Sequence, residues 1–150
     1  MLGRTHLAIG ALTALALESF ITPTNQAAYY IVVLIGSLLP DVDHEGSTIN
    51  NLFPLTHYAA KLVTHRGIFH TIFAPIAIGF VIGTLTQPQY GWYVLIGYLS
   101  HLASDSLTKL GVNWLYPFTE EKLGGPVTTG TWVETLIFWS ALFGIYVKVF

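Results

Sequence analysis

The chain has 150 residues, of which 53% are hydrophobic and only 9% are charged, and its mean hydropathy is +0.60. An ordinary soluble domain carries about 25% charged residues, so this composition indicates a small integral membrane protein with one domain, residues 1–150. The net charge of −2 provides no basic patch for nucleic acid, and the absence of cysteine excludes disulfides and thiolate ligands.

Five apolar segments are predicted to be helices, and turn signals separate them. In chain order they are residues 7–21, 27–39, 68–85, 90–103 and 131–150. A spanning helix needs roughly 20 residues, about 17 to 25, which the third and fifth segments reach as apolar runs. The others reach it if their polar ends are helical. The predicted fold is therefore all-α, a small polytopic membrane helix bundle of about five transmembrane or membrane-embedded helices.

Two further local predictions concern proline and glycine. Pro75 is expected to kink the third helix or to end its first turns. Residues 110–130, which are rich in glycine, proline and aromatic side chains, are expected to form a loop or a re-entrant piece. Within this segment, Trp114, Tyr116 and Phe118 are typical of an interfacial aromatic belt, with a lid over a site as the alternative.

Histidine and aspartate recur at the same end of the predicted helices. Imidazoles and carboxylates bind zinc, manganese or iron, and unpaired ones are costly next to hydrocarbon. If the helices alternate across the bilayer, all of these side chains meet on one face, so we predict a metal site there. The candidate ligands are His6, Asp41, Asp43, His44, His65, His70, His101 and Asp105.

Each motif also has a structural alternative. His101 and Asp105 are four positions apart and share a helical face, as two ligands of one metal would. The alternative is a hydrogen-bonded pair that packs two helices together. Asp41 and Asp43 would point the same way if that segment is extended. The alternative for these two carboxylates is a helix-capping turn.

The remaining polar residues are weaker candidates. His65 and His70 are five positions apart, which places His65 in the loop before the third helix. Both histidines could instead be interfacial. His6 has no candidate ligand near it in the sequence, and it is a candidate only because it is predicted to lie on the same side of the membrane as the others. Glu134 begins on the same face, where an ordinary helix-start carboxylate is the simpler interpretation.

The positive charges predict the orientation. Five basic residues lie on the side of the candidate ligands, whereas Lys148 lies on the opposite side. The positive-inside rule therefore places the N-terminus and the site in the cytoplasm, in a multi-pass protein of the cell (inner) membrane. The five are Arg4, Lys61, Arg66, Lys109 and Lys122.

Several of these motifs, taken in order, resemble a known family. They are Thr5-His6, the stretch LPDVDH at 39–44, HRGIFHT at 65–71, GYLSH at 97–101 with Asp105, and residues 108–112 through 116–118. Together they resemble the YdjM type of predicted membrane-bound metal-dependent hydrolases of bacteria and archaea, one member of which is described as LexA-regulated. The resemblance covers about residues 3 to 120. Thr71 stands where the family usually has serine. The resemblance implies a multispanning protein with a metal-dependent hydrolase activity.

The chemistry predicted from the ligands is hydrolysis. The set exceeds what one tetrahedral zinc needs, so it suits either two metals sharing an aspartate or one metal with acid/base residues. Zinc is the first expectation for one or two divalent ions, with manganese or iron as alternatives. Arg66 would bind a phosphate through its planar fork. We therefore expect hydrolysis of a phosphoester in a membrane lipid or lipid-linked small molecule, with Asp41, Arg66 and Asp105 as the catalytic candidates.

A different class of protein fits the same residues. A non-catalytic metal-binding or metal-transporting membrane protein would use the same kinds of side chain. The clustering of the ligands on one face disfavours transport, because a transporter needs ligands along a route through the bundle. It does not disfavour a catalytically silent metal site.

Overall fold

The computed structural model describes residues 1–43 and 67–150, and of Asp43 only the backbone. In these ranges the predicted all-α class is confirmed, because all five expected segments contain an α-helix and no β-strand occurs beyond two isolated bridges. The elements are α1 (Gly3–Ile21), α2 (Gln26–Gly36), η1 (Leu39–Asp43), η3 (Ile68–His70), α5 (Phe73–Leu85), α6 (Pro88–Ser106) and α7 (Trp132–Val149).

Short signals in the sequence set the boundaries of the first helices. Thr22 follows α1 in the left-handed conformation, with φ of 45°, and Pro23 comes next, so the helix cannot continue. Asn25 then caps α2 by accepting a hydrogen bond from the amide of Ala28 at 3.0 Å. Pro88 opens α6, at a position where no amide is needed.

The third predicted helix, residues 68–85, is divided in the structure. The short 3₁₀ helix η3 covers Ile68–His70, Thr71 is extended, and α5 begins at Phe73. Pro75 lies in the first turn of α5, where its missing amide costs no helical hydrogen bond. The expected kink or end at Pro75 is therefore not what divides this segment: the break lies at Thr71, before Pro75, and it separates His70 from α5.

The segment around Asp41 is not extended, which corrects the sequence-based interpretation. Helix α2 ends at Gly36, and η1 covers Leu39–Asp43 as a 3₁₀ helix. The amide of Asp41 donates to the carbonyl of Leu38 at 3.1 Å, which is the i to i−3 bond of this conformation. Asp41 and Asp43 therefore do not lie on one face as residues i and i+2 of a strand would.

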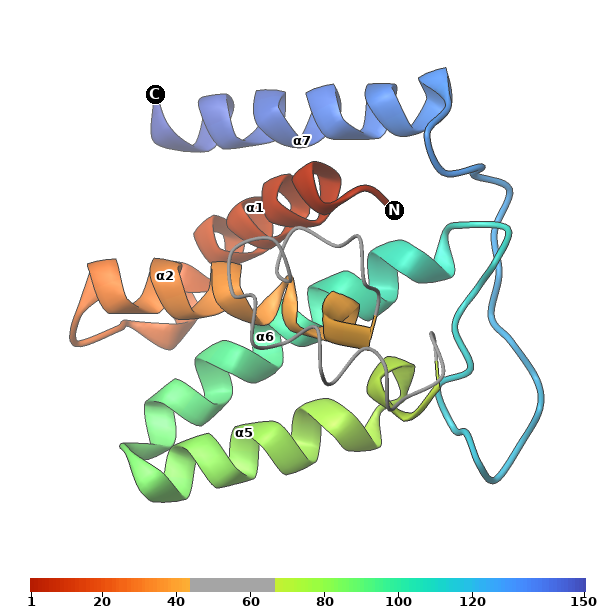
Figure 1. Cartoon of the computed structure of the whole chain (residues 1–150). Coiled ribbons are helices and arrows are strands. Elements are labelled where there is room, and N and C mark those ends of the chain that lie inside the picture. The colour runs from red at the N-terminus through yellow and green to blue at the C-terminus, as the bar shows by residue number, and fades with distance from the viewer. Residues whose placement is uncertain (44–66) are drawn as a thin grey trace.

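Helix α6 lies among the other helices and packs against α1, α2 and α5 (Figure 1). Glycines allow the close approach. A Cβ atom at Gly36 would lie 2.7 Å from the carbonyl oxygen of Val94, and one at Gly97 would overlap the carbonyl of Val33. Small residues at helix contacts are typical of bundles in lipid, where backbones pack closely. This packing fixes the position of the C-terminal half of α6, which carries His101 and Asp105, relative to α2.

The outer surface of the helices is rich in large apolar side chains. Phe80 on α5, Trp92 on α6 and Phe143 on α7 are each more than 60% exposed. Among the helices described, only α7 combines 18 residues with a mean hydropathy of 1.3, enough by length and composition to cross a membrane. Helix α5 has 13 residues, or about 20 Å at 1.5 Å per residue, shorter than a hydrocarbon core of about 30 Å.

Residues 107–131 connect α6 to α7 without a helix, as predicted for most of this segment. Isolated bridges join Thr108 to Val127 and Val112 to Leu123. Trp114 packs against the core cluster of Tyr98 and Leu102 and its Nε1 donates to Ser106 at 2.9 Å. Trp114 is thus partly buried in the protein, whereas the side chain of Phe118 is 78% exposed.

Candidate metal centre

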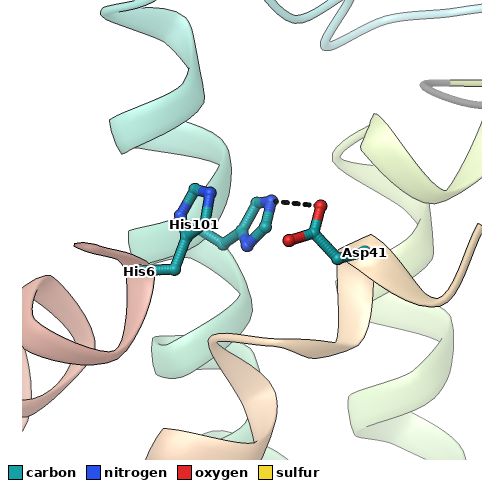
Figure 2. A group of neighbouring side chains, drawn as sticks. All are labelled: His6, Asp41 and His101. Atoms are coloured by element: carbon teal, nitrogen blue, oxygen red, sulfur yellow. Dashed lines mark ion pairs between the residues drawn. The ribbon is translucent and has the colours of Figure 1, made fainter. Parts of the chain in front are cut away.

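Five of the predicted ligands come together from four separate elements. His6 comes from the first turns of α1, Asp41 from η1 and His70 from the end of η3. His101 and Asp105 come from one face of α6, as their spacing of four residues predicts. Figure 2 shows the rings of His6 and His101 side by side, with the carboxylate of Asp41 directed at His101. The chain thus brings together residues up to 99 positions apart.

The distances are those of a compact cluster. Nε2 of His101 lies 3.7 Å from Oδ1 of Asp41 and 3.9 Å from Oδ2 of Asp105. Nε2 of His6 lies 3.4 Å from Oδ1 of Asp105, and Nε2 of His70 lies 3.9 Å from Oδ2. The rings of His6 and His101 stack with centroids 3.6 Å apart. Each carboxylate therefore faces imidazole nitrogens at distances that exceed a hydrogen bond.

The far nitrogen of His101 is already engaged. Its Nδ1 lies 2.8 Å from the carbonyl oxygen of Ser37. A carbonyl only accepts, so Nδ1 carries the proton and donates it, and Nε2 of the neutral ring carries the lone pair. That lone pair points into the cluster. A histidine that binds a metal through Nε2 needs this tautomer.

His101 and Asp105 on α6 do not form the hydrogen-bonded pair that was the structural alternative for this motif. The separation of 3.9 Å between His101 and Asp105 is an ion-pair distance, not a hydrogen bond. Among the described residues, no atom makes a hydrogen bond to Nε2 of His6 or to Nε2 of His101. Leaving a buried acceptor without a partner costs about 1–3 kcal/mol. A cation between these atoms would remove that cost.

In the part of the chain that the structure describes, two overlapping groups of three residues could hold an ion, and both include His101. The first adds His6 and Asp41, and the second adds His70 and Asp105, with the ligand atoms of each group within 4.8 Å of one another. Because His101 offers only its Nε2, it can bind one ion, and the two groups form one centre. Three imidazoles and two carboxylates suit zinc, manganese or iron.

The cluster is closed on most sides. His6, His70 and His101 are fully buried and Asp105 is 1% exposed, whereas the side chain of Asp41 is 15% exposed. Burial raises the pKa of the Asp41 carboxyl. Solvent therefore reaches the described part of the cluster from the side of η1.

Asp105 also has a positive partner at the chain start. The buried α-amino group of Met1 forms an ion pair with Oδ1 of Asp105. A buried carboxylate requires such compensation, and this contact places positive charge beside the carboxylate that also faces His6.

The other predicted site residues are not part of the described cluster. His44, His65 and Arg66 and the side chain of Asp43 lie outside the residues that the structure describes. Glu134 is buried, but its carboxylate accepts from the amides of Leu2 and Gly130, both at 2.6 Å. Glu134 therefore links the start of α7 to the start of α1 through backbone hydrogen bonds. This agrees with its interpretation as an ordinary helix-start carboxylate.

The residues that orient the ligands were not predicted from the sequence. Ser104 lies 2.9 Å from Nδ1 of His6, and the carbonyl of Ser37 accepts from His101. Ser104 shares the face of His101, three residues apart, so helical spacing could have identified it. The carbonyl of Ser37 could not have been identified from the sequence, because every residue has a backbone carbonyl.

Comparison with known proteins agrees with the motifs. The chain matches the model of the family described as YdjM inner membrane protein over residues 1–149. It is 30% identical over 142 residues to the protein YvsG of Bacillus subtilis, covering 91% of this chain and 87% of that protein. It is 32% identical over 93 residues to the inner membrane protein YdjM of Escherichia coli and to that of Shigella flexneri, covering 56% of this chain and 46% of each relative. No solved structure matches. The chain belongs to the YdjM inner membrane protein family.

Proposed function

We propose that this chain is a membrane-embedded metal-dependent hydrolase that acts on a phosphoester in a lipid or lipid-linked substrate. The observation that carries the proposal is the convergence of His6, Asp41, His70, His101 and Asp105, with the Nε2 atoms of His6 and His101 lacking hydrogen-bond partners among the described residues. Such a set serves little purpose in a hydrocarbon environment unless it binds a cation.

The donor set fits a divalent transition metal. Neutral imidazole nitrogens and carboxylate oxygens are the ligands of zinc, manganese and non-haem iron, and Nε2 of His101 carries its lone pair near the carboxylates of Asp41 and Asp105. A metal held there would activate water and polarise the bond to be cleaved. His101 and Asp105 would hold the ion, and Asp41, the most exposed member, would meet the substrate side.

The surroundings of the centre support a lipid as the proposed substrate class. Large apolar side chains cover the outer faces of the helices, so a lipid reaches the protein more readily than a polar solute does. In the sequence, Arg66 stands two residues before η3 and four residues before His70. Its guanidinium would bind two phosphate oxygens at once, which a carboxylic ester does not offer.

We place the protein as a polytopic bundle in the inner membrane with the site at the cytoplasmic face. The family is one of inner membrane proteins, and α1, α6 and α7 have 18 or 19 residues each, about 27–28 Å of helix. Helices α2 and α5 are shorter and would be embedded with their polar ends below the headgroups. The positive-inside rule sets the orientation.

A non-catalytic metal-binding protein is the second candidate. It is favoured by the burial of the centre, since four of its five described ligands are at most 1% exposed. Catalytic metal sites keep one position open for water or substrate, whereas structural sites are closed. The exposure of Asp41 supports the catalytic proposal over this one.

Activity of the purified protein distinguishes the two candidates. We would load the wild type with zinc or manganese in lipid nanodiscs and assay phosphatidic acid, a polyprenyl phosphate and carboxylic esters for hydrolysis. Asp105→Asn removes a charged ligand, and Glu18→Gln is the matched control, because Glu18 contacts Tyr30 and Gln26 away from the cluster. The hydrolase proposal predicts phosphate release by the wild type and the control only. A metal-loaded wild type that cleaves no compound would favour the binding protein.

A further inference from the structure

The hydroxyl of Ser104 contacts two groups of the candidate centre at once. Its Oγ donates to the carbonyl oxygen of His101 at 2.8 Å, one turn earlier on α6. The same Oγ lies 2.9 Å from Nδ1 of His6, on α1. Ser104 is 3% exposed, so water does not compete for either contact.

The direction of these bonds determines the tautomer of His6. A hydroxyl has a single proton, and Ser104 gives it to the carbonyl of His101. Its oxygen can then only accept from His6, so Nδ1 of His6 carries the proton. Nε2 of the neutral ring then carries the lone pair, and it lies 3.4 Å from Oδ1 of Asp105.

We propose that Ser104 is a positioning residue for metal binding: it accepts the Nδ1 proton of His6 and thereby holds the Nε2 lone pair toward Asp105. This inference rests on the proposed metal centre. The Ser37 carbonyl does the same for His101, so both stacked rings are held in the ligand tautomer. Of these two groups, only Ser104 acts through a side chain and can be removed by mutation.

Ser100 provides a matched control on the same helix. Its Oγ donates to the carbonyl of Gly97 at 2.7 Å, the same i−3 bond that Ser104 makes. Ser100 is also buried, at 7% exposure, and has no contact with a histidine among the hydrogen bonds of the described residues. Replacing either serine by alanine removes the same helical contact, and only Ser104→Ala removes the partner of His6.

The test is a double-mutant cycle on metal affinity. Affinity for Co²⁺, as a spectroscopic probe, and for Zn²⁺ would be measured by competition with a chelator in the wild type, Ser104→Ala, Ser100→Ala, His6→Ala and the double variant His6→Ala with Ser104→Ala. Loss of an outer partner of a ligand typically costs 10–100-fold in metal affinity. We expect that loss in Ser104→Ala, with an altered Co²⁺ spectrum, and less than about twofold change in Ser100→Ala. In the His6→Ala background, Ser104→Ala should have no further effect, because the two residues act as one unit.

The outcomes separate this inference from the metal centre itself. A wild type that binds metal while Ser104→Ala binds it equally well, with the same spectrum, would overturn the role of Ser104 and leave the centre intact. Additive losses in the double variant would also overturn it, because they would show that Ser104 acts independently of His6. A folded wild type that binds neither ion would instead contradict the proposed function.

Discussion

At the scale of single residues, the candidate centre depends on how each side chain is held, because His6 and His101 each use one ring nitrogen to contact a hydrogen-bond partner and direct the other toward a carboxylate. His101 is the central member, since both groups of candidate ligands include it. Its Nδ1 is held by a backbone carbonyl, so its ring cannot turn away without losing that bond. Asp105 faces three imidazoles and would supply negative charge to offset a cation in the proposed centre.

Removing either of these α6 ligands should therefore abolish most metal binding. We expect His101→Ala and Asp105→Asn each to lose more metal affinity than the 10–100-fold typical of an outer-shell partner, because the ion loses a direct ligand. Metal content after passage over a chelating resin is the measurement. Glu18→Gln should retain wild-type content, and full occupancy in both α6 variants would exclude these residues as ligands.

Arg66 tests recognition of phosphate. Arg66→Lys keeps the positive charge but loses the two-oxygen contact of the guanidinium. We expect unchanged metal content and a fall in phosphoester hydrolysis of about ten- to a thousandfold, equivalent to roughly 1.4–4 kcal/mol in the activation free energy. Unchanged turnover of every phosphoester that the wild type cleaves would remove Arg66 from substrate binding.

At the scale of elements, glycine contacts hold the ligands in register. Gly97 lies four residues before His101 on α6 and directly against the backbone of α2. Helix α2 in turn leads to Ser37 and η1, which carry the carbonyl partner of His101 and the carboxylate of Asp41. Close packing of α2 on α6 therefore sets the distance between these groups.

A methyl group at Gly97 should separate the two helices. Gly97→Ala would overlap the carbonyl of Val33, whereas Gly83→Ala would meet only ordinary contacts, the nearest at 3.5 Å. We expect Gly97→Ala to lose about 1–3 kcal/mol of stability, the usual cost of overpacking, and to weaken metal binding as well. Thermal unfolding in detergent measures the first effect and chelator competition the second. Equal stability of the two variants would contradict the assigned packing.

The sequence predicted the elements better than their ends. Five apolar runs and the turns at Pro23 and Pro88 were sufficient to place the five α-helices, because apolar periodicity and proline act locally. The 3₁₀ helix at Asp41 and the break at Thr71 were not predicted, since both depend on how short segments pack against α6. The cluster was predicted from the spacing of His101 and Asp105 and from alternation, whereas the orienting role of Ser104 required the three-dimensional contact with His6.

At the scale of the whole molecule, the ends of the elements that carry the ligands meet, although the chain reverses direction between them (Figure 1). This is the arrangement that alternating spans would produce. It places the turn at Thr24 and the connection before α7 at opposite ends of the proposed bundle, with the centre near the latter.

Single cysteines can test this topology, because the chain has none of its own. Thr129→Cys and Thr24→Cys are both at exposed positions outside the helices. In intact cells, a membrane-impermeant maleimide should label the Thr24 variant and not the Thr129 variant, with both labelled after lysis. Labelling of both positions in intact cells, or of Thr129 alone, would contradict the alternation or the cytoplasmic placement of the site.

The metal content of the purified wild type tests the central claim most directly. After purification in detergent, reconstitution with zinc, manganese or iron and removal of loose ions on a chelating resin, elemental analysis would be combined with circular dichroism to verify the helical fold. We predict that at least one divalent transition metal ion per chain is retained. A helical, monodisperse protein that retains none of the three metals would contradict the metal centre and the function proposed from it.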